Sequence, residues 1–173
     1  QIVGKGEVNN VYVFFTASAK FVVRIDPNED SPERFEKEAW CINESQKNGV
    51  LGAKVSKIGM YNGHPYIVLT FLEGVDGYET PEAQHAKIWT TLGGYARQIH
   101  NLKVSGYGEK MIAPGVFNGS WEKFLAYNIS SLTGEDKLIN LGIITLEQSK
   151  ILLDVFVKLK NTAFNFGLIH NDL

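Results

Sequence analysis

The sequence predicts an α+β protein in which a β-rich lobe is followed by a helical lobe. Short runs rich in Val, Ile, Phe and Tyr fill the first 72 residues and are separated by turn-forming residues. One segment with apolar residues at helical spacing interrupts these runs, and helical spacing prevails after residue 80. We therefore expect a β-rich lobe at residues 1–72, a linker at 73–80 and a helical lobe at 81–173.

Five β-strands are expected in the first lobe, three before a helix and two after it. They lie at residues 1–4, 11–16, 20–26, 53–61 and 64–72. The last two are joined by Asn62-Gly63, a pair typical of a tight hairpin turn. Strands joined by short turns pair antiparallel, so the pattern predicts a five-stranded antiparallel sheet with one packed helix.

That helix is expected from Ser31 to Lys47, between the third and fourth strands. Ser31 is the expected N-cap, Pro32 falls in the first turn, and Asn-Gly follows the last turn. Three apolar residues recur at helical spacing and mark the face toward the sheet: Phe35, Ala39 and Ile42.

Three helices are expected in the second lobe, at residues 81–101, 118–132 and 145–166. Their apolar residues recur at helical spacing. These residues are Ile88, Leu92, Ala96 and Ile99 in the first helix, Trp121, Phe124, Leu125 and Ile129 in the second, and Leu152, Val155, Phe156, Leu159 and Ala163 in the third. The sequence shows no internal repeat and no low-complexity segment.

The composition fits a protein with a real core and excludes several partners. The 173 residues are 44% hydrophobic and carry a net charge of −2, without the basic stripe that nucleic acid binding needs. No apolar run approaches the length of a membrane span, and no basic segment followed by an apolar one, the pattern of a secretory signal, is visible in these residues. The single cysteine, Cys41, lies in an apolar helical stretch and is expected to be a buried thiol. A cytoplasmic protein is the plain interpretation.

The turn between the first two strands contains glycines at positions 4 and 6. A Gly-rich hairpin lets backbone N–H groups approach phosphate oxygens, because no Cβ intervenes. It is not a Walker A sequence. An ordinary β-turn with nothing bound explains the pattern equally well.

The strand "FVVRID" places a cation among apolar residues. Alternation puts Val22 and Arg24 on one face, and such a cation needs a counter-charge or an anionic ligand unless that face is solvated. Glu38 lies between the apolar positions of the helix and is the expected partner. Glu36 is the alternative.

The fifth strand leads into the linker through "LTFLEG". Where the sheet ends, the backbone polar groups of Thr70 and Leu72 lose their neighbour on one side, so a donor and an acceptor are left at a lobe boundary. A simple connector between the lobes, with no ligand bound, explains this segment equally well. If these groups do bind a ligand, Thr70→Ala should leave affinity nearly unchanged, because the contact is main-chain.

The chain ends with His170 and Asp172 directly after an apolar stretch. Surface C-termini are usually polar and frayed, and the chain starts with Gln1 in place of Met, so we expect a trimmed sequence. The pair His-x-Asp is compatible with a metal site, a structural pair or a catalytic base, but the other histidines show no ligand spacing with it.

Taken in order, these phrases resemble the protein-kinase-like superfamily: "GKGEVNNVYVF", "FVVRID", "FEKEAW", "YIVLTFLEGVDG", "LGGYARQIHNL" and "FGLIHNDL". The chain is similar to its aminoglycoside phosphotransferase and choline-kinase-like branch over essentially the whole length. The resemblance implies a two-lobe kinase-like fold, a five-stranded antiparallel first lobe with one helix, and a second lobe that is incomplete and stops within the catalytic loop.

The resemblance also implies a role for each site residue. The implied nucleotide site consists of Gly4, Gly6, Val22, Arg24, Glu38, Thr70 and Leu72. The glycines lie over the phosphates, Arg24 contacts phosphates, Glu38 orients Arg24, and the groups of Thr70 and Leu72 bind adenine. Asp172 accepts the proton of the substrate hydroxyl and His170 braces the loop.

Three departures from the family pattern stand out. Arg24 replaces the usual lysine, although its planar fork still suits phosphate, and Asn9 replaces the third glycine. The Asn and Asp that would bind Mg²⁺ have no counterpart here, so they are expected after Leu173.

The resemblance thus implies a phosphotransferase that uses ATP (or GTP) and Mg²⁺ to phosphorylate a hydroxyl of a small molecule. An aminoglycoside-like acceptor, and with it antibiotic resistance, would fit the acidic residues near the linker: Glu73, Asp76, Glu79 and Glu82. The fragment itself is expected to be nearly inactive, to bind nucleotide weakly, and to self-associate if its apolar helix faces stay uncovered. The alternative is a non-catalytic nucleotide-binding or scaffold module.

Overall fold

A computed structural model describes residues 2–5, 9–75, 77–132 and 134–169 of the chain. The chain divides into two compact units, one made of residues 1–103 with 167–173 and the other of residues 104–166. Each unit is described by itself below. Together they contain the helices and the antiparallel sheet of an α+β protein, which confirms the fold class.

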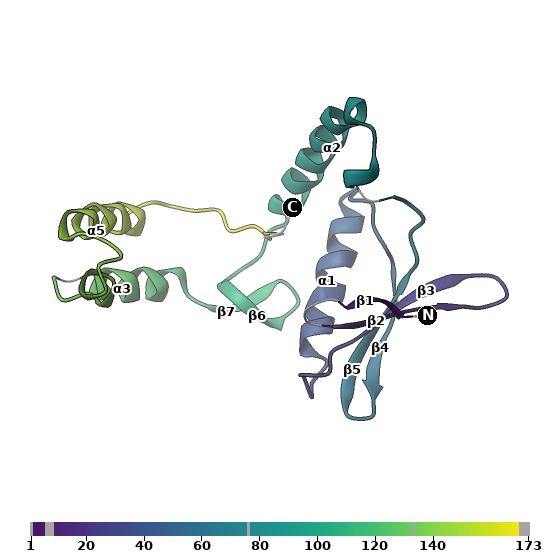
Figure 1. The fold of residues 1–173 in the computed structure, drawn as a ribbon. Coiled ribbons are helices and arrows are strands. Elements are labelled where there is room, and N and C mark those ends of the chain that lie inside the picture. Colours follow the sequence, from purple (N-terminus) through teal and green to yellow (C-terminus); the bar gives the residue numbers. More distant parts are fainter. Residues whose placement is uncertain (1, 6–8, 76, 133, 170–173) are drawn as a thin grey trace. The chain divides into compact units, whose positions relative to one another are not determined.

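The first unit is built on an antiparallel sheet (Figure 1). Its strands are β1 (Ile2–Lys5), β2 (Asn10–Phe15), β3 (Lys20–Ile25), β4 (Val55–Tyr61) and β5 (His64–Thr70), in the order β1-β2-β3-β5-β4. The four strands β2 to β5 form its continuous part, and β1 joins the edge of β2 with an irregular register. Between β4 and β5, Asn62 and Gly63 take φ values of 50° and 81°, as the predicted hairpin turn requires.

The register of the central strands decides which side chains share a face. Val22 of β3 lies opposite Val13 of β2 and Leu69 of β5. Residues directly opposite each other project to the same side of a sheet, and alternate residues along a strand do so too. Val22 and Arg24 therefore share one face, as predicted.

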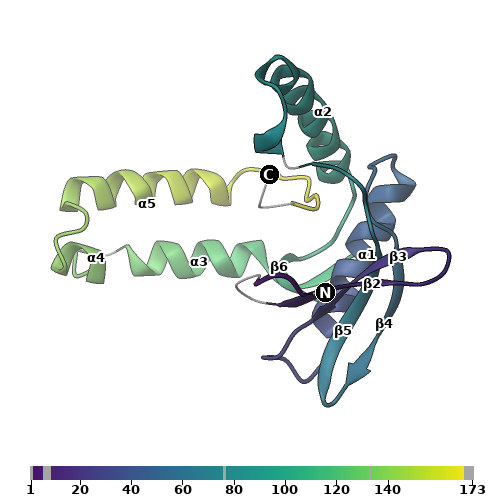
Figure 2. The same ribbon diagram turned by 45° about the vertical axis from the view of Figure 1, so that its right-hand side comes forward.

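Helix α1 (Glu33–Lys47) covers that face of the sheet (Figure 2). Phe35 and Ala39 are buried with Ile67 and Leu69 of β5, and Ile42 packs against this core. The predicted apolar face of the helix is confirmed. Burial of such a face supplies most of the stability of a protein helix.

The predicted start of α1 is wrong by two residues. The N-cap position is held by Pro32, which offers no side-chain cap. The Ser31 hydroxyl instead accepts the N–H of Glu33 at 3.4 Å. A proline before the first turn fixes φ at a value that suits helix entry, so the local turn is set without a capping side chain.

The loop between β3 and α1 is fastened by a buried carboxylate. Asp26 is only 1% exposed. Its Oδ2 accepts a hydrogen bond from Arg34 Nη1 at 2.9 Å, and its Oδ1 accepts the N–H of Asn28 at 3.1 Å. Because a buried charge is costly unless it is paired, this ion pair holds the strand and the helix in one arrangement.

After β5 the first unit continues through a short 3-10 helix, η1 (Gly77–Glu79), into α2 (Glu82–His100). The predicted helix at 81–101 is confirmed, and Ile99 and Leu102 are buried at its end. Lys103 pairs with Gly167 there, and a Cβ at position 167 would lie 2.0 Å from the His100 carbonyl oxygen. Only glycine fits that contact.

The second unit combines a small hairpin with a helical pair. It contains β6 (Tyr107–Ala113), β7 (Val116–Gly119), α3 (Trp121–Ser131), the short α4 (Lys137–Asn140) and α5 (Leu146–Lys160). Helices α3 and α5 run side by side (Figure 1). The predicted helix at 118–132 is confirmed from Trp121 onward, whereas the hairpin and α4 were not predicted.

The predicted helix at 145–166 is right in its start and wrong in its end. Thr145 and Gln148 form a capping box at the first turn, but α5 stops at Lys160. Beyond it, Phe164 and Phe166 contact the ring of Trp121. Tertiary aromatic contacts therefore override the helical pattern of this segment.

Several apolar side chains of α5 face solvent, among them Ile151, Leu152, Val155 and Val157. The expectation that self-association covers these side chains stays a prediction. Within the described residues, no helix is long and apolar enough to cross a membrane.

We predict that Arg34→Ala lowers the free energy of unfolding by about 2 kcal/mol, because it strips a charged hydrogen bond from a buried carboxylate. In the Asp26→Asn background the same change should cost less than about 0.5 kcal/mol, since no buried charge is left unpaired. Urea unfolding of the four proteins measures this cycle. Equal losses in both backgrounds would show that Arg34 acts through other contacts.

Candidate functional site

An ion pair joins the sheet to the helix on the shared face. Arg24 Nη1 of β3 donates to Glu38 Oε1 of α1 at 2.5 Å. The two side chains are 26% and 28% exposed, so both charges lie in a half-buried setting. The predicted pairing of Arg24 with Glu38 is confirmed, and the alternative partner, Glu36, is exposed on the same helix.

The cation is further fixed by its neighbours. The guanidinium carbon of Arg24 lies 5.6 Å from the centre of the Phe35 ring, within the range of a cation–π contact. Val22 packs against the core on the same face of β3. The guanidinium has five donors, and a single carboxylate contact leaves donors available for an anion.

The end of β5 is shaped by its two neighbouring strands. Phe71 N–H donates to the carbonyl of Lys20 at 3.2 Å. In an antiparallel ladder, hydrogen-bonded and non-hydrogen-bonded pairs alternate, so the next pair, Phe21 with Thr70, is non-hydrogen-bonded. The backbone groups of Thr70 therefore point toward the β4 side, and Thr70 N–H indeed donates to the carbonyl of Lys54 at 2.9 Å.

The return bond at this position is unusual. The N–H of Lys54 donates to the hydroxyl oxygen of Thr70, Oγ1, at 2.8 Å and not to the Thr70 carbonyl. Among the described residues the structure shows no hydrogen bond to the Thr70 C=O or from the Leu72 N–H. Leu72 is exposed. The geometry thus leaves one acceptor and one donor, two residues apart.

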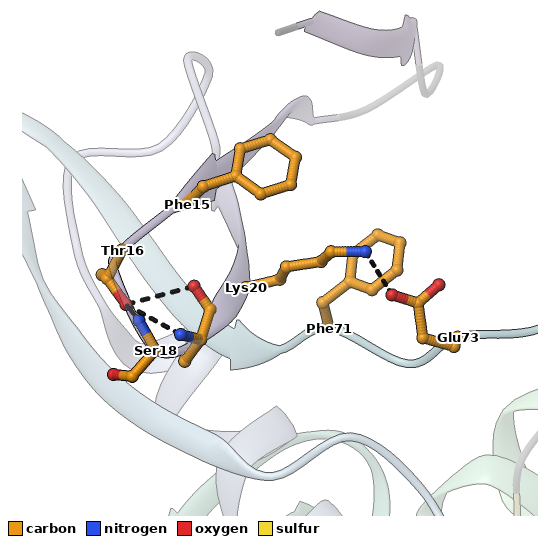
Figure 3. Close-up of a pocket in the computed structure, with 7 residues that line it drawn as sticks. Phe15, Thr16, Ser18, Lys20, Phe71 and Glu73 are labelled. Carbon is orange, nitrogen blue, oxygen red and sulfur yellow. Dashed lines mark hydrogen bonds and ion pairs between the residues drawn. The ribbon is translucent and has the colours of Figure 1, made fainter.

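A hollow of about 430 Å³ borders this segment (Figure 3). Its lining residues are Phe15, Thr16, Ser18, Ala19, Lys20, Phe71 and Glu73. The ammonium group of Lys20 forms an ion pair with the carboxylate of Glu73 and lies 5.3 Å from the centre of the Phe71 ring. The hollow is therefore bordered by an ion pair between the start of β3 and the residues after β5.

Sequence reasoning missed this link. Lys20 lies two residues before Val22, so strand alternation already placed it on the face of Arg24. Glu73 was interpreted only as one of the acidic residues near the linker. The sequence did contain a signal for this ion pair: Lys20 is a cation on the face of Arg24, and Glu73 is a carboxylate shortly after the strand that pairs with β3.

Asn9 adds a buried polar group next to the Gly-rich turn. It is 9% exposed, and its Oδ1 has no hydrogen-bond partner among the described residues. It lies one residue before β2 and two before Val11, which is opposite Arg24. Its side chain therefore projects toward the face that carries the ion pair.

The remaining expected site residues lie near the two ends of the chain. Gly4 lies within β1, whereas Gly6, His170 and Asp172 lie outside the described residues. Among the described residues, no group of three or more His, Cys, Asp or Glu side chains could hold a metal ion.

Cys41 of α1, expected to be a buried thiol, is half-buried. Burial raises the pKa of its thiol, opposed by the charge of Lys37 and reinforced by that of Glu38. A thiol with a raised pKa is a weak nucleophile at neutral pH, so Cys41 is not a reactive residue of this site.

Comparison with known proteins gives a family and a fold. A model of the phosphotransferase enzyme family matches residues 1–173. A search of curated proteins finds no match.

Solved structures with a similar fold include three relatives. The crystal structure of aminoglycoside phosphotransferase APH(4)-Ia has a TM-score of 0.72 at 14% identity, covering 100% of this chain and 59% of its own. A thermostable mutant of that enzyme, in ternary complex with AMP-PNP and hygromycin B, gives 0.65 at 13% identity, with 95% and 56% covered. Spectinomycin phosphotransferase APH(9)-Ia, in complex with ADP and spectinomycin, gives 0.53 at 17% identity, with 100% and 57% covered.

At these identities the likeness shows a shared α+β, kinase-like fold. The chain spans between 56% and 59% of the length of these relatives.

We predict that Glu38→Ala lowers the free energy of unfolding by about 1 kcal/mol, because it leaves the half-buried Arg24 without its carboxylate. The matched control Glu36→Ala removes an exposed carboxylate from the same helix and should change stability by less than about 0.5 kcal/mol. Chemical denaturation at low and high salt measures both, and the Glu38 effect should shrink with salt. Similar losses for the two variants would contradict a specific ion pair.

Proposed function

The chain belongs to the phosphotransferase enzyme family, and from this premise we propose that its first unit binds the nucleotide of an ATP-dependent phosphotransferase. The whole protein would transfer the γ-phosphoryl group to a hydroxyl of a small molecule. The observation that carries the proposal is the ion pair of Arg24 with Glu38 on the sheet face that also carries Val22.

The ion pair suits the phosphate end of a nucleotide. Glu38 fixes the guanidinium while leaving donors for phosphate oxygens, and charge-assisted contacts of arginine with phosphate are strong and directional. Gly4 and Gly6 would let backbone N–H groups approach the same phosphates. Phosphoryl transfer relies mainly on such positioning and charge neutralisation.

The base end of the nucleotide would lie at Thr70 and Leu72. The Thr70 carbonyl and the Leu72 N–H have no hydrogen bond among the described residues. An adenine offers an amino donor and a ring acceptor in matching order. Val22, on the face of Arg24, would contact the base.

Mg²⁺ is the usual companion of the nucleotide and supplies charge neutralisation at the phosphates. The described residues hold no cluster of acidic or histidine side chains that fits a metal ion. Its ligands are proposed to lie after Leu173.

The remaining catalytic roles are proposals from the family pattern. Asp172 would accept the proton of the acceptor hydroxyl, and His170 would brace the loop that holds it. Both would act at the acceptor side, whereas the described residues bind and orient the nucleotide.

The acceptor is proposed to be an aminoglycoside-like or other small alcohol. Structures of similar fold contain hygromycin B and spectinomycin, and an antibiotic-resistance role would follow from such a substrate. Glu79 and Glu82 are exposed and would favour a cationic acceptor, whereas Glu73 is engaged with Lys20. A cytoplasmic location, where ATP is supplied, belongs to the same proposal.

A non-catalytic nucleotide-binding or scaffold module is the second candidate. It shares the nucleotide site and differs in lacking transfer. ADP formation by the whole protein that depends on added aminoglycoside separates the two. The residues after Leu173 also do so, since the enzyme needs an Asn five positions past Asp172 and a later acidic residue.

We predict that Arg24→Ala lowers the affinity of the chain for ATP by about tenfold or more and leaves adenosine binding unchanged, because the lost contact is to phosphate. Lys57→Ala removes the same charge from an exposed position of β4 and should change neither affinity. Isothermal titration calorimetry of the folded variants measures these constants.

Two results would count against the proposal. Absence of ATP binding at millimolar concentration would remove the nucleotide site altogether. An equal loss of ATP and adenosine binding in Arg24→Ala would show that the arginine supports the fold and not the phosphates.

A further inference from the structure

The segment after β5 departs from a regular antiparallel ladder at one hydrogen bond. Thr70 and Lys54 lie opposite each other, and Thr70 N–H donates to the Lys54 carbonyl at 2.9 Å. In a regular ladder the Lys54 N–H would return a bond to the Thr70 carbonyl. It donates instead to Thr70 Oγ1 at 2.8 Å.

This substitution of one acceptor for another has a direct consequence. Because the Lys54 N–H donates to the Thr70 hydroxyl, it does not donate to the Thr70 carbonyl. The Thr70 carbonyl has no hydrogen bond among the described residues. A main-chain acceptor left at the end of a sheet strand is costly unless water or a ligand fills it.

We propose that the Thr70 hydroxyl is a positioning group that reserves the Thr70 carbonyl for the exocyclic amino group of adenine. The proposal rests on the proposed nucleotide site and deepens it by naming the side chain that keeps the base contact open. Adenine presents an N6 amino donor, whereas guanine presents an O6 acceptor at the equivalent position. A free carbonyl at Thr70 therefore accepts from adenine and repels guanine, and the site selects ATP over GTP.

The surroundings of Thr70 fit this role. On the β3 side of β5, the Phe71 N–H donates to the Lys20 carbonyl, and this bond fixes the register that leaves the Thr70 carbonyl at the strand end. Two residues on, the Leu72 N–H supplies the complementary donor for a ring nitrogen of the base. The side chain of Thr70 acts through its neighbour Lys54 and does not itself contact the base.

The Thr70 hydroxyl should therefore influence the affinity for the nucleotide, unlike what the sequence alone predicted. A main-chain contact alone predicted that Thr70→Ala would leave affinity nearly unchanged. In the structure, loss of the hydroxyl frees the Lys54 N–H, and the nearest regular acceptor is the carbonyl that adenine needs. The side chain therefore matters even though the contact is main-chain.

The test compares ATP with purine riboside triphosphate, which lacks only the 6-amino group. The folded chain should bind ATP about threefold to tenfold more tightly than the analogue, the range expected for one hydrogen bond. Thr70→Val keeps the branched shape but lacks the hydroxyl, and should reduce this ratio to about one. Thr70→Ser retains the hydroxyl and should keep the ratio of the unchanged chain.

A second substitution, at Lys54, distinguishes loss of the Thr70 hydroxyl from a change in the shape of the side chain at position 70. Lys54→Pro removes the N–H that competes for the carbonyl, at a position just before an edge strand where proline is tolerated. In the Thr70→Val background, Lys54→Pro should restore the preference for ATP over the analogue. Calorimetric titration with both nucleotides measures all of these proteins, after circular dichroism shows each to be folded.

The outcomes separate this proposal from the one it rests on. If the unchanged chain binds neither nucleotide at millimolar concentration, the nucleotide site fails and the role of Thr70 fails with it. If it binds ATP but Thr70→Val keeps the same ratio, or weakens both nucleotides equally, only the role of Thr70 is overturned. If Lys54→Pro does not restore the ratio, competition by the Lys54 N–H is overturned.

Discussion

The register of β3 between β2 and β5 is the constraint on which the candidate site depends. With Val22 opposite both Val13 and Leu69, the apolar side chains of three strands share one face and form the core under α1. A shift by one residue would turn every side chain of β3 to the other face. The same register carries Arg24 to the helix and brings the Lys20 carbonyl against Phe71, so both ends of the proposed nucleotide site follow from one pairing.

The ion pair of Arg24 with Glu38 lies where the sheet face meets the proposed phosphate site. Half-buried charges cost free energy to desolvate and regain it only in good geometry. A hydrophobic pair would hold the helix to the sheet equally well, so conformational stability alone does not explain the choice of residues. We propose that the guanidinium of Arg24, which keeps unused donors, serves an anionic ligand. The ion pair of Asp26 with Arg34 differs in its role. Both oxygens of that carboxylate accept hydrogen bonds from within the protein, one from the loop and one from α1.

Sequence patterns predicted the parts of this protein that depend on local periodicity. Phe35 and Ala39 marked the buried face of α1, and strand alternation placed Arg24 opposite Glu38. The patterns failed where tertiary contacts decide the outcome. Phe164 continued a helical pattern, but its ring packs on Trp121 and the helix ends earlier. The hydrogen bond between Lys54 and the Thr70 hydroxyl had no sequence signal, because only the pairing of β4 with β5 brings these residues together.

The central claim is that a nucleotide binds to the sheet face and strand end of the first unit. An NMR titration of the isotope-labelled chain with a non-hydrolysable ATP analogue tests it most directly. We expect the largest shifts at the Leu72 amide, the Arg24 guanidinium and the turn residues near Asn9, and unchanged signals for exposed residues of β4 such as Lys57. Shifts confined to residues 104–166 would contradict it.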